Sequence, residues 1–88
     1  MAQTYDVIVT VTSQKGKCSH GHKVGDSWRV GGTTPAGLCL SALDAMLTNV
    51  RTMQFGGEFP WESDPDRATV VCPDAANPVV FELRRVKR

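Results

Sequence analysis

The chain has 88 residues, 41% of them hydrophobic, and carries ten basic against nine acidic residues. This length predicts a single domain over residues 1–88, and the apolar fraction excludes an intrinsically disordered chain. The net charge of +1 argues against a general attraction to nucleic acid or to an anionic membrane surface.

Two strands are predicted in the first third of the chain. Residues 5–13 alternate between two faces and contain many β-branched side chains, which is typical of a strand. A polar loop with two glycines follows over residues 14–22. Residues 27–30 form a second, short strand that ends at Gly31-Gly32.

A helix is predicted in the middle of the chain, because apolar side chains recur there at helical spacing. Its apolar stripe consists of Leu40, Leu43, Leu47 and Val50, with Met46 and Met53 beside it. One possible start has Thr34 as the cap and Pro35 as the first helical residue. The other has Ser41 as the cap of a capping box with Asp44. Gly56-Gly57 ends the helix.

The last third of the chain contains an irregular segment and two strands. Residues 55–67 are rich in glycine, proline and acidic side chains, and we expect Phe59 and Trp61 to pin this segment onto the core. Residues 68–72 and 79–86 form strands that pair as a hairpin. The order strand–strand–helix–strand–strand predicts the α+β class, with one main helix packed on a small antiparallel sheet of about four strands.

Basic residues gather at the end of the chain: Arg84, Arg85, Lys87 and Arg88. We interpret them as the solvated end of the last strand rather than as a nucleic-acid patch. The chain shows neither an apolar stretch that can span a bilayer nor the basic start and apolar core of a signal peptide. We therefore expect a cytoplasmic protein without a membrane partner, whose thiols stay reduced.

The cysteines Cys18, Cys39 and Cys72 are the strongest candidates for a functional site. Each lies at the end of a predicted segment among turn residues, and an odd number of cysteines cannot pair completely in internal disulfides. Three converging thiolates, with or without a histidine, would form a metal or iron–sulfur site. The alternative is that they are ordinary core or loop residues.

Two histidines close to Cys18 extend this candidate site. In the run Cys18-x-His20-x-His22, alternate side chains of an extended segment point the same way, so two of the three can face one ion. The pair Cys72-Pro73 also occurs in ferredoxin-type cluster motifs. The chain has no Cys-x-x-Cys pair, which weakens the case for zinc.

Two further groups of residues allow a functional and a structural interpretation. His22 and Asp26 can act as a general base and its orienting partner, or Asp26 can cap the backbone amides of a tight turn. A further hypothesis is a small enzyme with Cys18 or His22 at a pocket, but the sequence contains no nucleophile–base motif that supports it. Trp61, beside Phe59, either forms a binding surface or completes the core.

Six motifs in order cover nearly the whole chain: KGKC (15–18), GHKVGD (21–26), GLC (37–39), GGEFPW (56–61), CPD (72–74) and NPVVFEL (77–83). In these motifs the chain resembles a family of small uncharacterised prokaryotic proteins, some of which are described as repeat proteins. The resemblance implies that the three cysteines and His22 match family positions, whereas His20 matches no family motif. It also implies iron–sulfur chemistry, because many members come from anaerobes. One departure is Leu47-Thr48-Asn49-Val50, where similar proteins carry a proline and aromatics.

The leading hypothesis is an iron–sulfur cluster bound by the three cysteines, with His22 as the fourth ligand or with an open fourth position. The first alternative is a structural zinc site of the Cys3His type. The second is a metal-free interaction module that forms homo-oligomers through its helix or through residues 55–61. A redox protein is the expected partner of a cluster protein, and the sequence indicates neither a substrate nor a reaction.

Overall fold

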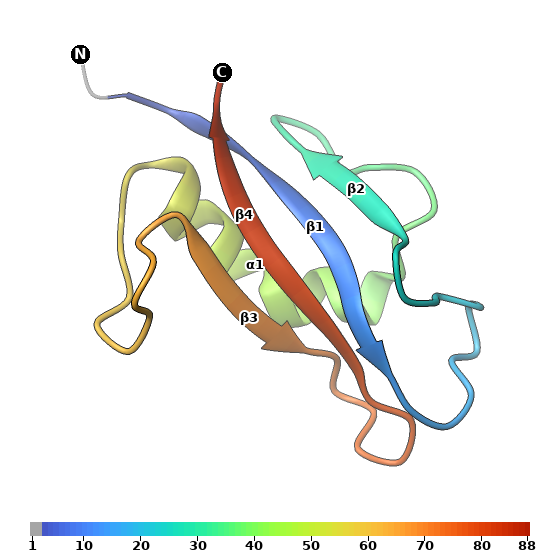
Figure 1. Cartoon of the computed structure of the whole chain (residues 1–88). Coiled ribbons are helices and arrows are strands. Elements are labelled where there is room, and N and C mark those ends of the chain that lie inside the picture. Colours follow the sequence, from blue (N-terminus) through green and yellow to red (C-terminus); the bar gives the residue numbers. More distant parts are fainter. Residues whose placement is uncertain (1–2) are drawn as a thin grey trace.

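The computed structural model describes residues 3–88 and contains five elements in the predicted order (Figure 1). They are β1 (Tyr5–Gln14), β2 (Ser27–Val30), α1 (Leu40–Gln54), β3 (Arg67–Val71) and β4 (Val79–Lys87). The α+β class, with one helix packed on a four-stranded antiparallel sheet, is confirmed. Met1 and Ala2, the first two residues of the predicted domain, lie outside the described residues.

The sheet has the strand order β2-β1-β4-β3, and each neighbouring pair is antiparallel. The predicted hairpin between the last two strands is confirmed as β3–β4. The middle of the sheet is the long pairing of β1 with β4, in which Val9 lies opposite Leu83. A register shift between Val11 and Ser13 marks a β-bulge near the end of β1. The first and last strands therefore form the centre of the sheet.

Helix α1 covers one face of the sheet, and the core lies between the two layers (Figure 1). Alternate residues of the central strands point into this core, as the two-residue period of a strand requires. The buried apolar side chains of these strands are Val7, Val9, Val11, Val79, Phe81 and Leu83. Each such burial contributes about 1.5–3 kcal/mol relative to an exposed side chain. Within residues 3–88 no helix covers the opposite face of the sheet, which we call the open face.

The buried face of α1 differs in part from the predicted stripe. The buried helix residues are Ala42, Met46, Val50, Met53 and Gln54. Leu40 is 77% exposed and Leu47 is 45% exposed, so the prediction is wrong for these two leucines and confirmed for Val50 and both methionines. Helical spacing indicates that the helix has an apolar stripe. It does not decide between two neighbouring stripes with the same spacing, and packing against the sheet determines which of them is buried.

Helix α1 begins at Leu40 with Cys39 as its N-cap, so neither predicted start is correct. Gly37 has a positive φ of 84°, a conformation that interrupts any helix begun at Thr34. Ser41 already lies inside the first turn. Within the described chain Cys39 makes no side-chain capping bond, and the first turn contains no acidic residue. Neither the N-cap side chain nor a carboxylate of the first turn therefore compensates the positive end of the helix dipole.

The C-terminal end of α1 is fixed to the sheet by two buried polar side chains. Gln54 donates to two carbonyls at the end of β2, at 3.2 and 2.9 Å. Arg85 of β4 donates to the Gly57 carbonyl at 2.7 Å and to the Asp66 carboxylate at 2.8 Å. Arg85 is only 8% exposed, so the expected solvation of the C-terminal basic residues is wrong at this position. Gly56, with a φ of 85°, ends the helix as predicted.

None of the helices in residues 3–88 combines the length and the apolar character that crossing a membrane requires.

Candidate functional site

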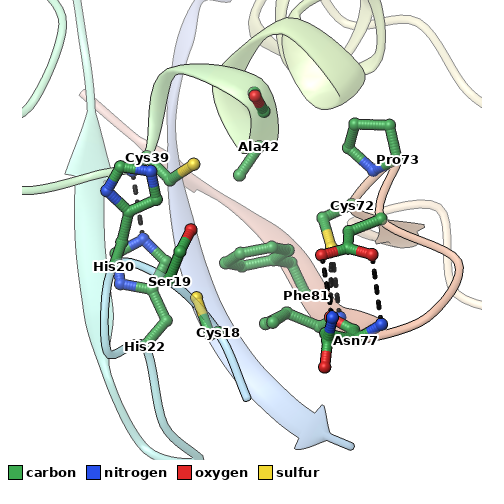
Figure 2. Close-up of a pocket in the computed structure, with 13 residues that line it drawn as sticks. Cys18, Ser19, His20, His22, Cys39, Ala42, Cys72, Pro73, Asn77 and Phe81 are labelled. Atoms are coloured by element: carbon green, nitrogen blue, oxygen red, sulfur yellow. Dashed lines mark hydrogen bonds between the residues drawn. The ribbon is translucent and has the colours of Figure 1, made fainter. Parts of the chain in front are cut away.

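The three cysteines line one pocket of about 250 Å³ at the start of α1 (Figure 2). Cys18 comes from the loop between β1 and β2, Cys39 from the helix N-cap, and Cys72 from the residue after β3. His20 and His22 also line this pocket, and so does Phe81 of β4. Residues that are distant in sequence therefore line the same pocket.

The loop that carries Cys18 is tied to the turn that follows Cys72. The Lys17 amide donates to the Asn77 side-chain oxygen at 2.8 Å, and the Lys15 amide donates to the Pro78 carbonyl at 3.0 Å. Gly16 has a φ of 69°, and a Cβ there would overlap the Asn77 side chain. The glycine of the KGKC motif therefore permits the close approach of these two loops.

Cys72 is held by the turn that connects β3 to β4. Its sulfur accepts a hydrogen bond from the Val79 amide at 3.2 Å and lies 3.9 Å from the Asn77 carbonyl oxygen. Asp74 closes the turn by accepting from the Ala76 and Asn77 amides at 3.1 and 3.2 Å. The CPD and NPVVFEL motifs thus build the local structure that orients this thiol toward the pocket.

His22 is a buried member of the pocket wall and braces the start of α1. Its Nε2 accepts the Cys39 amide hydrogen at 3.0 Å. The ring is 6% exposed and packs edge-on against Trp28, with centroids 4.8 Å apart. Burial lowers the pKa of His22, the charge of His20 lowers it further, and Asp26 opposes both. The imidazole is therefore neutral near neutral pH, with its proton on Nδ1.

Asp26 has the turn-capping position that the sequence allows. Its carboxylate accepts from the Lys23 amide at 3.0 Å and lies 3.8 Å from the Lys23 ammonium group. This carboxylate influences His22 through its charge, and within residues 3–88 the two side chains share no hydrogen bond.

The cysteines share the pocket but do not surround a single point. Figure 2 shows Cys18 and Cys39 on the side of the Phe81 ring where the histidines lie, and Cys72 on the other side near Asn77. Among the described residues, no group of three or more His, Cys, Asp and Glu side chains is arranged to hold one metal ion. The pocket therefore presents separated thiols around an aromatic floor.

The remaining candidates lie further out. His20 is exposed, with its ring 6.1 Å from that of His22. Trp61 lies outside the pocket and is 71% exposed, stacked on Phe59 at 5.1 Å between ring centroids. Phe59 packs against the core as predicted, whereas the same expectation is wrong for Trp61, which packs on Phe59 instead.

Phe81 and Asn77 are among the pocket residues that are absent from the sequence-based candidates. Phe81 forms the floor between the thiols, but in the sequence it is one apolar residue of an alternating strand. Asn77 holds the Cys18 loop, and its only signal is its place in an Asn-Pro turn. Both roles depend on which loops meet in space.

Comparisons with protein-family models, with curated proteins and with solved structures found no match to this chain. The resemblance to the family of small prokaryotic proteins therefore stays a prediction.

Proposed function

We propose that this protein binds an iron–sulfur cluster through Cys18, Cys39 and Cys72. The observation that carries the proposal is the gathering of all three cysteines, from three distant segments, in one pocket of about 250 Å³. We also propose the cytoplasm as its compartment, because thiols stay reduced there. A redox protein that exchanges electrons with the cluster is the corresponding partner.

The three thiols are not arranged around a single ion. A tetrahedral zinc ion with Zn–S bonds of about 2.3 Å needs its sulfurs roughly 3.8 Å apart. Residues 3–88 contain no group arranged in that way. A cluster distributes its cysteine ligands over several iron atoms, so its ligands stand further apart and surround a larger volume.

The surroundings of the thiols also fit a negatively charged cluster. The Val79 amide donates to the Cys72 sulfur at 3.2 Å, and hydrogen bonds to ligating sulfurs are one of the means by which proteins set cluster potentials. The start of α1 faces the same pocket through Cys39, and the positive end of a helix dipole favours negative charge.

His22 supports this site as a positioning residue. Its Nε2 is engaged by the Cys39 amide at 3.0 Å, so the imidazole holds the helix start and the thiol of Cys39 in place. Under this proposal the three cysteines hold the cluster, and its fourth position is open to a small molecule or to the exposed His20.

The test is anaerobic purification of the full chain, followed by measurement of iron, sulfide, zinc and visible absorbance. We expect the wild-type protein to contain iron and sulfide and to absorb visible light. Each of Cys18→Ser, Cys39→Ser and Cys72→Ser should lose most of the iron, because a three-thiolate site has no spare ligand. Ser19→Ala changes the same pocket wall without removing a thiol and should keep the iron.

Two results would contradict the cluster. One is wild-type protein that takes up no iron after anaerobic incubation with iron and sulfide. The other is stoichiometric zinc that resists replacement by iron, which would establish the Cys3His zinc alternative. In that case a chelator should unfold the protein, because a structural zinc contributes directly to folding.

A metal-free interaction module is the second candidate function. It is favoured by large apolar side chains that remain exposed on α1 and in residues 55–61: Leu40, Phe55 and Trp61 are 77%, 60% and 71% exposed. A second copy of the chain is the partner in this case. The protein would then be larger than one chain in solution, and Cys72→Ser would keep full stability.

A further inference from the structure

The open face of the sheet gathers arginines that are far apart in the sequence. The register places Ile8 of β1 opposite Arg29 of β2 and opposite Arg84 of β4, and Arg84 opposite Arg67 of β3. Directly opposite residues on neighbouring antiparallel strands point to the same face. Because Ile8 alternates with the buried residues of β1, this row lies on the face away from the helix. We call Arg29, Arg84 and Arg67 the arginine row.

Carboxylates on this face lie beneath the guanidinium groups. Asp6 accepts from Arg29 and from Arg88, both at 2.8 Å. Its side chain is 17% exposed, against 55% for Arg29 and 42% for Arg88. These two hydrogen bonds, that of Arg29 first, lower the pKa of Asp6, so the carboxylate stays charged and holds both arginines.

Glu82 has the same arrangement at the other end of the arginine row. It lies 2.9 Å from Arg67 and 3.7 Å from Arg84, and its side chain is 28% exposed, against 40% and 45% for the two arginines. Two loop carboxylates approach at longer distances, Asp64 at 3.4 Å from Arg84 and Glu62 at 3.8 Å from Arg67. On the strands themselves, the carboxylates of Asp6 and Glu82 are each shared by two guanidinium groups and are less exposed than both of them.

We propose that the arginine row binds the phosphate backbone of single-stranded nucleic acid. Neighbouring strands are about 4.8 Å apart, so the row extends for roughly 14 Å from β2 to β3, which is enough for a few successive phosphates. Guanidinium groups contact phosphate oxygens in a bidentate manner and keep donors free when one side is paired. A flexible single strand can also follow the twist of the sheet.

The chemistry of this face further defines the ligand. Half-buried Ile8, Val80 and Val86 lie between the charged side chains and can contact sugars and bases. The described strands carry no aromatic side chain on this face, so stacking cannot select particular bases. Binding should therefore be independent of sequence and weak at high salt, and it depends on the local arginine row because the net charge of +1 provides no general attraction.

The test is fluorescence anisotropy of a labelled oligouridylate of about 12 nucleotides with the full chain. Contacts of three arginines with a single strand predict a slope of about −2 for log K against log salt. Arg84→Gln should weaken binding about eightfold at 50 mM salt and reduce the slope by about 0.7. Arg51→Gln, which removes an exposed arginine of α1, is the matched control and should leave binding unchanged.

Three results would overturn the proposal. They are no binding at 50 mM salt, equal weakening by Arg84→Gln and Arg51→Gln, or equally tight binding of polyglutamate, which would indicate an acidic protein partner. Thermal unfolding of Arg84→Gln shows whether a loss of binding reflects a loss of fold, and Arg29→Gln then provides an independent variant. Binding by Cys72→Ser protein should equal that of the wild type, so this test is separate from the cluster proposal.

Discussion

The imidazole of His22 is held as a neutral hydrogen-bond acceptor by its position in the fold. Burial beside Trp28 disfavours the charged ring, and the Cys39 amide needs the lone pair on Nε2. A proton on that nitrogen would remove the acceptor at the start of α1. The protonation state of His22 therefore affects the position of Cys39, which is a candidate cluster ligand.

Stability should decrease as the pH is lowered below about 6.5, the ordinary pKa of histidine, because burial lowers the pKa of His22 in the folded chain. The unfolded chain then binds the proton more readily, so this contribution is complete above 6.5 and is lost as the pH falls. Urea unfolding at a series of pH values measures it, with His22→Gln as a non-titrating control. Parallel curves for both proteins between pH 7 and pH 5 would refute this role. Asp6, whose pKa is lowered by Arg29 and Arg88, acts in a separate range below 3.8.

Neighbouring arginines of β4 should differ in their effect on stability. Arg85→Ala removes hydrogen bonds to the Gly57 carbonyl and to Asp66 from a position only 8% exposed, which should cost about 2 kcal/mol. Arg84 pairs with carboxylates on the open face at 3.4 Å and beyond, so Arg84→Ala should cost less than about 1 kcal/mol. Denaturant unfolding compares the two variants, and similar losses would show that the buried arginine does not fix the helix end.

At the scale of elements, helix α1 offers a direct comparison between two apolar stripes. Met46 is fully buried over the sheet, and Met46→Ala should destabilise the protein by about 2–5 kcal/mol. Leu47 is 45% exposed, and Leu47→Ala should cost less than about 1 kcal/mol. Thermal or denaturant unfolding checks both variants. A larger loss for Leu47→Ala would mean that a partner covers this side of the helix.

The strands were predictable because their alternation reports burial directly. Residues 27–30 agree with β2, the strands predicted over 5–13 and 79–86 are each one residue too short at the C-terminal end, and the strand predicted over 68–72 is shifted by one residue from β3. The start of α1 was not predictable in this way, because it depends on the positive φ of Gly37 and on a hydrogen bond from the Cys39 amide to His22. A residue 17 positions away in the sequence thus decides where the helix begins.

At the scale of the whole molecule, the candidate cysteines were predictable and their arrangement was not. Their positions at segment ends indicate that they can meet, but the meeting requires the turn after β3 to lie beside the loop after β1, which follows from the β1–β4 pairing. The arginine row was missed for a related reason. Its members come from three strands, and the cluster visible in the sequence is divided by the fold, since Arg85 points into the protein.

The pairing of β1 with β4 also governs the order in which the chain can fold. Tyr5 lies opposite Lys87, so the central ladder closes a loop that contains all the other elements, β2, α1 and β3. Closing that loop costs chain entropy before the contacts of the core can compensate for it. In contrast, α1 and the β3–β4 hairpin need only local contacts. Folding should therefore end, rather than begin, with the centre of the sheet. Until then the thiols of the pocket belong to segments that are not yet neighbours.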